Sequence, residues 1–230
     1  MNILVINPNT SEAFNRKLEA TAKLYALEST AVTVISPQVG PQTIEGVFDE
    51  TVSIPGTMQA FREREPDYDA VILACYSDPL VVAAMRELSA KPVLGIAEAS
   101  IYTACMLGSQ FSIVTTNDRW KPLLREAVHK YGVAAKCASI RTTGMHVADL
   151  ENEHGGSVED QIEAQAQAAV TQDGAEVICL GCAGMSGLDK RLQDKFGVPV
   201  LDGFVCAIKL LEGFHQYGIS HSKILTYATP

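Results

Sequence analysis

The feature that most constrains the fold of this chain is one sequence pattern that occurs twice. Residues 69–75, Asp-Ala-Val-Ile-Leu-Ala-Cys, align with residues 176–182, Glu-Val-Ile-Cys-Leu-Gly-Cys, and their cysteines are 107 positions apart (182 − 75). Two further pairs have nearly the same separation, namely Pro92 with Pro199 (199 − 92 = 107) and Ile6 with Val114 (114 − 6 = 108). Three pairs at nearly one offset indicate an internal duplication and therefore two similar lobes.

Each half alternates short runs rich in β-branched residues with longer segments of helical periodicity. Predicted strands span residues 2–6, 31–35, 70–74, 93–96, 111–115, 135–140, 176–180 and 198–201. Predicted helices span residues 11–27, 55–64, 79–89, 120–131, 158–172, 188–196 and 204–217. Because consecutive parallel strands need a crossover connection, this alternation predicts an α/β fold with a central, mainly parallel sheet in each lobe.

The two predicted lobes pack closely, since no flexible linker separates them. The first lobe comprises residues 1–97 together with 205–230, and the second comprises residues 98–204. A pseudo-twofold relation between the lobes places equivalent strand ends opposite each other. Ligands bind beyond the carboxyl ends of the strands in open parallel sheets, so we expect the active site in the cleft between the lobes.

The charge and hydropathy of the chain exclude several classes of partner. It has 18 basic and 27 acidic residues and a formal net charge of −9, which disfavours nucleic acid and anionic membranes. It has neither a basic signal-peptide region nor an apolar run of the ~18 residues that a membrane span needs. We therefore expect a cytoplasmic protein.

Two of the six cysteines stand out by their position in the repeat. Cys75 and Cys182 each follow a predicted strand directly and are equivalent under the duplication. Two thiols on opposite walls of one cleft suit a two-base proton exchange. One thiolate removes a proton from a carbon next to a carbonyl, and the opposite thiol delivers one to the other face. The alternative, two structural cysteines, is the commoner role of a single buried cysteine, but the symmetric positions favour catalysis.

The residues after each cysteine are expected to favour the thiolate. Ser77 or Asp78 can cap a helix that begins at Pro79, and residues 183–186 lead into a second helix. Backbone N–H groups and the positive end of a helix dipole lower a thiol pKa from its usual value of ~8.5. We therefore predict that both thiols have a lowered pKa.

Polar loops follow the first strand of each half. Asn7 and Thr116 lie there, where they can hydrogen-bond substrate carbonyl and N–H groups; helix capping is the alternative role. No lysine or arginine is adjacent to either cysteine in the sequence. The predicted ligand is therefore a small, neutral, carbonyl-rich molecule.

No motif predicts a metal or a nucleotide cofactor. Cys179 and Cys182 match C-x-x-C, but Cys179 lies inside a predicted strand, which disfavours a redox or zinc role. A group of acidic residues and histidines fits no standard ligand spacing and indicates a solvated loop: His146, Asp149, Glu151, Glu153 and His154. No phosphate-binding G-x-G-x-x-G is present.

Six segments resemble the hydantoin and allantoin racemases, members of the aspartate/glutamate racemase superfamily. They are residues 6–11 (Ile-Asn-Pro-Asn-Thr-Ser), 74–79 (Ala-Cys-Tyr-Ser-Asp-Pro), 95–99 (Gly-Ile-Ala-Glu-Ala), 111–116 (Phe-Ser-Ile-Val-Thr-Thr), 180–185 (Leu-Gly-Cys-Ala-Gly-Met) and 198–203 (Val-Pro-Val-Leu-Asp-Gly). The resemblance implies two pseudo-symmetric flavodoxin-like lobes. It also implies cofactor-independent racemisation at C5 of a 5-substituted hydantoin or allantoin, with Cys75 and Cys182 at the acid and base positions.

The residues beside the cysteines favour the hydantoin branch. Amino-acid racemases of the superfamily have Asn-Thr after the first cysteine and Thr after the second, whereas this chain has Tyr76-Ser77 and Ala183-Gly184. We expect these four residues to contact the substrate. Residues 43–46, Thr-Ile-Glu-Gly, resemble a loop that lies over the substrate in that branch, and Ser77-Asp78-Pro79-Leu80 replaces its usual Gly-Asp-Pro-Gly.

Three alternatives stay open at this point. A decarboxylase of the same superfamily characteristically keeps one cysteine, and a non-catalytic small-molecule binding protein needs neither, so the intact pair weighs against both. A maleate-type isomerase also has two cysteines. The sequence does not choose between allantoin and other 5-substituents, and it leaves a homo-oligomer open.

Overall fold

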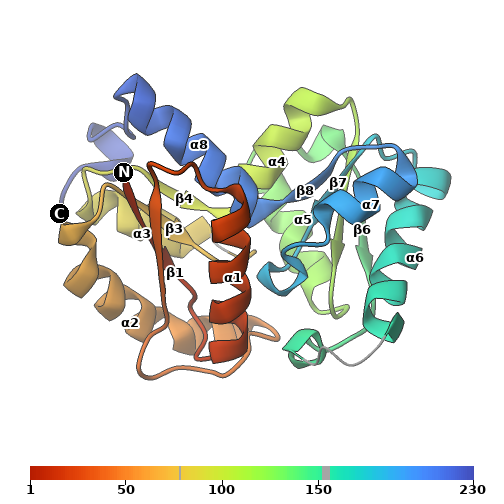
Figure 1. The fold of residues 1–230 in the computed structure, drawn as a ribbon, viewed down its shortest axis with the longest axis horizontal. Helices are drawn as coiled ribbons and strands as arrows, with labels where there is room; N and C mark the ends of the chain where they lie inside the picture. Colours follow the sequence, from red (N-terminus) through yellow and green to blue (C-terminus); the bar gives the residue numbers. More distant parts are fainter. Residues whose placement is uncertain (78, 152–155) are drawn as a thin grey trace.

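A computed structural model, in which residues 1–77, 79–151 and 156–230 are described, contains two four-stranded parallel sheets (Figure 1). The first has the order β2-β1-β3-β4 and comprises β1 (Asn2–Ile6), β2 (Ala31–Ile35), β3 (Ala70–Leu73) and β4 (Val93–Gly95). The second has the order β6-β5-β7-β8 and comprises β5 (Phe111–Thr115), β6 (Cys137–Thr142), β7 (Val177–Leu180) and β8 (Val200–Asp202). Equivalent strands occupy equivalent places, so the predicted α/β fold with two similar lobes is confirmed.

Helices flank both sheets in the described part of the chain (Figure 1). They are α1 (Glu12–Tyr25), α2 (Val47–Arg64), α3 (Pro79–Leu88), α4 (Ile96–Leu107), α5 (Trp120–Lys130), α6 (Gly156–Asp173), α7 (Asp189–Phe196) and α8 (Gly203–Tyr217). Short 3₁₀ segments are η1 (Glu65–Asp67), η2 (Ala134–Lys136), η3 (Val147–Glu151), η4 (Ala183–Met185) and η5 (Leu225–Tyr227). None of the helices described is both long and apolar enough to cross a membrane.

The central strands are fully buried, which explains why they are apolar on both faces. Residues 3–6 of β1 and all of β3 and β7 are buried. Helices cover both faces of such a sheet, so neither face needs polar residues. The loop after β1 leads into α1, where the Ser11 side chain accepts a hydrogen bond from the Phe14 N–H at 3.2 Å and caps the helix.

One helix and the ends of several elements differ from the sequence-based prediction. Helix α4 was not predicted, because its residues 96–101 are all buried and the segment has no polar face to reveal a helical period. Helix α2 begins at Val47 instead of at Pro55, and its first turn exposes Val47 and Phe48. Strand β6 starts two residues later than predicted, at Cys137.

Helices α4 and α8 pack against each other at the junction of the lobes (Figure 1). Each of them also contacts strands of both sheets. The lobe boundaries at residues 97/98 and 204/205 therefore stay a prediction. This junction holds the two sheets in one body, on which the geometry of any site between them depends.

A close backbone contact at this junction predicts the effect of one substitution. A Cβ added at Gly203, the first residue of α8, would collide with the carbonyl oxygen of Ile96, the first residue of α4. We expect Gly203→Ala to lower the free energy of unfolding by about 2–3 kcal/mol, because neither helix start can retreat alone. Urea denaturation measures this change. Gly213→Ala is the matched control, since a Cβ there meets nothing within 4 Å; equal midpoints for the two variants would contradict the contact.

Candidate active site

Cys75 and Cys182 line the same pocket. Each lies two residues beyond the carboxyl end of its strand, β3 for Cys75 and β7 for Cys182. The two strands occupy equivalent third positions in their sheets, so the pocket has a thiol from each lobe. Its volume is about 480 Å³ with the open mouth included.

The two sulfur atoms have equivalent hydrogen-bond partners in the backbone. A backbone hydrogen bond from Ser77, two residues after Cys75, acts against the rise in the pKa of the Cys75 thiol that burial causes. A backbone hydrogen bond from Gly184, two residues after Cys182, acts in the same way on the Cys182 thiol. The Ser77 hydroxyl adds a second contact, 3.2 Å from the Cys75 sulfur. Each thiolate that forms here is therefore stabilised by a nearby donor.

The prediction that both thiols have a lowered pKa is wrong for the structure without ligand. Burial raises the pKa of the Cys75 thiol to about 12 and that of the Cys182 thiol to about 11. Loss of hydration disfavours the thiolate more than the hydrogen bonds favour it. The expected dipole behind Cys182 is also weak, because η4 has three residues and α7 begins only at Asp189. Asp78, a predicted cap, lies outside the described residues.

Charged residues make the two thiols inequivalent. The Glu50 carboxylate contributes to the raised pKa of Cys75, and the Glu45 carboxylate to that of Cys182. Lys17 of α1 opposes this at Cys182, and its Nζ donates to the Gly184 carbonyl oxygen across the cleft. Sequence adjacency missed Lys17, since it is far from Cys182 in the chain and reaches it only from the other lobe.

Asn9, rather than Asn7, lines the pocket after β1. The Asn7 Nδ2 donates to Asn9 Oδ1 and to Asn15 Oδ1, both at 2.9 Å, and Asn7 is almost fully buried. Asn9 Oδ1 also accepts from the Ser11 N–H at 2.9 Å. These bonds hold the Asn9 side-chain amide in one orientation. The position of Asn7 thus supports a role in orienting Asn9, and its contact with a substrate stays a prediction.

Thr116 brings an unpaired hydroxyl to the pocket. Its residue is 1% exposed, and its Oγ1 has no hydrogen-bond partner among the described residues. Its carbonyl oxygen accepts from the Thr143 and Gly144 N–H groups at 2.9 and 3.0 Å, which holds the loop in place. An unpaired buried hydroxyl is costly, so a ligand that hydrogen-bonds Thr116 gains free energy.

The four residues predicted beside the cysteines all line the pocket. The Tyr76 hydroxyl, however, is 2.6 Å from the Ser100 hydroxyl of α4, so it is already paired. Gly184 lies against the apolar wall, where an added Cβ would be 2.7 Å from Leu150 Cδ1 and 3.0 Å from Phe14 Cε1. Their contact with a substrate stays a prediction.

An apolar wall completes the pocket and was missed by sequence reasoning. It consists of Phe14, Ile44, Trp120, Leu124 and Val147. Trp120 and Leu124 belong to the hydrophobic core as well as to the pocket, and the helical stripe on which they lie reveals only the core role. A face of α5 that serves both purposes has no distinguishing pattern.

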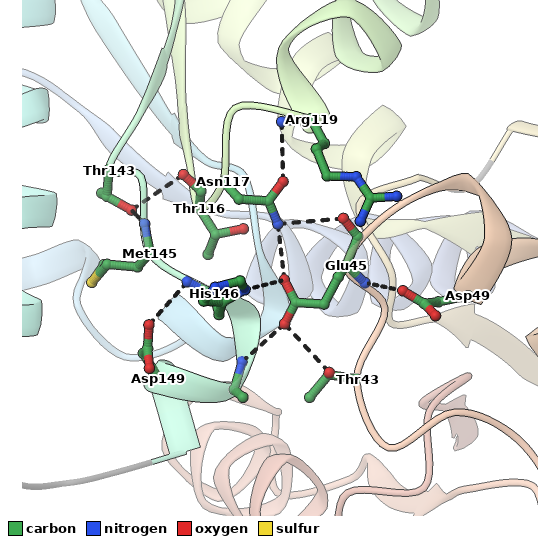
Figure 2. A network of polar contacts seen from close by, with 11 residues as sticks. Thr43, Glu45, Asp49, Thr116, Asn117, Arg119, Thr143, Met145, His146 and Asp149 are labelled. Atoms are coloured by element: carbon green, nitrogen blue, oxygen red, sulfur yellow. Dashed lines mark hydrogen bonds and ion pairs between the residues drawn. The ribbon is translucent and has the colours of Figure 1, made fainter.

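Figure 2 shows how the segment 43–46 is attached to the second lobe. Asn117 Nδ2 donates to the Glu45 carboxylate at 2.9 Å and to the Glu45 carbonyl oxygen at 3.3 Å. The Ala148 N–H donates to the other carboxylate oxygen at 3.2 Å, and His146 Nδ1 is 3.8 Å from the carboxylate. Glu45 thus ties a loop of the first lobe to two loops of the second, next to Ile44 in the pocket wall.

The remaining cysteine and histidine motifs lie outside the pocket. Cys179 is buried, and its sulfur is 3.8 Å from the Ser100 carbonyl oxygen, whereas Cys182 faces the pocket. Within residues 1–77, 79–151 and 156–230, no three His, Cys, Asp or Glu side chains are grouped as a metal site. Glu153 and His154 lie outside the described residues.

This chain is similar to known proteins in both sequence and structure. The family model described as Asp/Glu/Hydantoin racemase matches residues 3–211. A hydantoin racemase of Pseudomonas sp. (strain NS671) is 42% identical over 231 residues, which cover 100% of this chain and 92% of the relative. Allantoin racemase structures from Klebsiella pneumoniae and Pseudomonas fluorescens superpose with TM-scores of 0.95 and 0.94, at 36% and 38% identity. Both matches cover 100% of this chain, and 94% and 97% of the respective structures.

Proposed function

Because this chain belongs to the Asp/Glu/Hydantoin racemase family, we propose that it inverts C5 of a 5-substituted hydantoin or of allantoin. In this proposal Cys75 and Cys182 are the acid and the base, and no cofactor takes part. The observation that carries it is that both thiols, from equivalent strands of two lobes, line one pocket.

The proposed reaction consists of two proton transfers. One thiolate removes the C5 proton, which is acidified by the adjacent carbonyl and ring nitrogen, and the electron pair moves onto the carbonyl oxygen. The opposite thiol then delivers its proton to the other face of C5, and the carbonyl forms again. Hydrogen-bond donors near the developing oxyanion lower the barrier. The Thr116 hydroxyl and Asn9 Nδ2 are the candidates for this role.

The lining of the pocket supports a neutral substrate. Its polar groups at Asn9 and Thr116 are uncharged, and the Lys17 ammonium is already bonded to the Gly184 carbonyl oxygen. The apolar wall offers Trp120 and Leu124 to the substituent at C5. A hydantoin ring presents carbonyl and N–H groups to the polar side and its substituent to the apolar side.

A panel of optically pure hydantoins, allantoin and maleate tests the proposed function. Loss of optical rotation from a hydantoin or from allantoin is the expected result. Solvent deuterium at C5, measured by mass spectrometry, links the loss to proton exchange. Conversion of maleate alone, or tight hydantoin binding without isotope exchange, would contradict the proposal.

The raised thiol pKa values predict that activity increases with pH. The base is active only as thiolate, and at pH 8 a thiol with a pKa of about 11 is ionised in about one molecule in a thousand. We therefore expect kcat/KM to rise about tenfold per unit between pH 7 and pH 9. Initial rates corrected for enzyme-free racemisation measure it. A level profile over this range would show that the reacting thiols ionise at or below neutral pH.

A further inference from the structure

A second hollow adjoins the active pocket beside Ser77. Its charged lining residues are Glu50 of α2 with Glu126 and Lys130 of α5, and it shares Ser77, Trp120 and Leu124 with the active pocket. Ser77 thus lies between the Cys75 thiol and a hollow that is lined by two carboxylates and one ammonium group.

Ser77 acts on groups on both sides of this boundary. The Ser77 Oγ is 3.2 Å from the Cys75 sulfur, and either atom can be the donor. Ser77 and Glu50 line the second hollow together, and the Ser77 hydroxyl acts to lower the pKa of the Glu50 carboxyl as a hydrogen-bond donor. A hydroxyl donates one proton and accepts others, so Ser77 can pass a proton in either direction.

Cys182 has no such arrangement among the described residues. Its hydrogen bond comes from the Gly184 backbone N–H, which does not exchange its proton readily, and the nearby charges are the Lys17 ammonium and the Glu45 carboxylate. The two halves of the site are therefore asymmetric in a way that the repeat does not predict. Among the described residues, a side-chain hydroxyl lies between the thiol and a carboxylate at Cys75 and not at Cys182.

We propose that Glu50 is the solvent-side end of a proton relay that reprotonates Cys75 through Ser77. The inference rests on the proposed function, in which Cys75 becomes a thiolate each time it delivers its proton to C5. Glu50 in its acid form donates a proton to Ser77 Oγ, while the Ser77 hydroxyl proton moves to the Cys75 sulfur. The Glu50 carboxylate then takes a proton from water or a buffer acid, and the Cys182 thiol, which holds the proton taken from C5, releases it to water or a buffer base, so that the starting protonation states return.

The pKa values of Glu50 and Cys75 favour proton transfer from Glu50 to Cys75. Burial raises the pKa of Glu50 above its ordinary value, so its acid form is more populated than that of an exposed glutamate. Burial also raises the pKa of Cys75 to about 12, so the transfer from a carboxylic acid to the thiolate is downhill. Glu50 does not contact the reacting carbon in this scheme and is a positioning and relay residue.

Glu50→Gln tests the relay because an amide keeps the shape of the carboxylate and cannot carry the proton. We expect kcat to fall about tenfold or more while kcat/KM changes less than about twofold, because recovery of the free enzyme limits only saturated turnover. Ser77→Ala should lower kcat and kcat/KM together, because the Ser77 hydroxyl also contacts the Cys75 sulfur. Ser77→Thr, which keeps a hydroxyl, should keep kcat near the wild-type value. Glu126→Gln is the matched control, since Glu126 is an exposed carboxylate of the same hollow.

The following results would overturn the relay. If Glu50 acts by charge alone, the Glu50→Gln substitution favours the Cys75 thiolate. Cys75 then reacts faster with iodoacetamide, and kcat is unchanged or higher. If Glu50 is only structural, kcat and kcat/KM of the Glu50→Gln variant fall together. A wild-type protein without racemase activity would overturn the proposed function and the relay with it, whereas an active wild type with an equally active Glu50→Gln overturns the relay alone.

Discussion

Cys75→Ser and Cys182→Ser should each lower racemisation of the substrate by about a thousandfold or more. A serine hydroxyl is a far weaker acid than a thiol, so neither variant can supply one of the two proton transfers. In the proposed scheme the remaining thiol cannot compensate, because it serves only one face of C5. Polarimetry from each enantiomer in turn measures the loss.

The controls separate loss of chemistry from loss of structure. Cys105→Ser alters a half-buried cysteine of α4 that does not line the pocket, and it should keep wild-type activity. The double variant of Cys75 and Cys182 should be little worse than either single variant, because residues that act as a unit are not additive. Racemisation at the wild-type rate by either single variant would contradict the two-base scheme.

Glu45→Ala should lower kcat/KM by about 10- to 100-fold, the effect of losing hydrogen bonds to a charged group that is largely shielded from water. The Glu45 carboxylate receives hydrogen bonds from Asn117 and Ala148 of the second lobe, and Ile44 beside it closes the pocket. Without this link the loop is free to leave the pocket, so the substrate is held less firmly between the thiols. We expect most of the loss in KM, measured from initial rates over a range of substrate concentrations.

Partners of Glu45 supply the matched controls. Asn117→Ala should reproduce the loss, and the double variant should add little to it, since both substitutions remove one link. His146→Ala should stay within about twofold of wild type, because its side chain is 78% exposed and the ion pair at 3.8 Å is largely screened. Equal effects of all three single substitutions, or none from Glu45→Ala, would contradict the proposed attachment.

Much of the fold follows from the sequence because local pattern and global symmetry agree. Strand β3 and its repeat β7 have the same length, burial and place in the sheet, so an offset read from the sequence relates the two lobes. Helix α4 could not be predicted this way, since its first six residues are all buried and that part of the helix lacks an amphipathic period. Its partner α8 is recognisable because exposed residues along it alternate with buried ones.

The residues of the candidate site could likewise be predicted from the sequence only in part. Residues adjacent to the cysteines in sequence, such as Ser77 and Gly184, could be predicted as neighbours of the pocket. Lys17 and Glu50 could not, because only the packing of α1 and α2 brings them near the thiols. The direction of the thiol pKa shift was missed for a related reason. Local helix starts are visible in a sequence, whereas the depth at which a sulfur is buried depends on both lobes.

The central claim is that two thiols act from opposite faces of C5, and one isotope measurement tests it most directly. An optically pure substrate is incubated with the enzyme in deuterium oxide, both enantiomers are recovered at low conversion, and an enzyme-free blank is subtracted. The account predicts that deuterium enters the product enantiomer while the remaining substrate keeps its proton, since the base and the acid are different groups. Comparable deuterium in the two enantiomers at low conversion would contradict the account, because it would show a single base that exchanges its proton with solvent and returns it to either face.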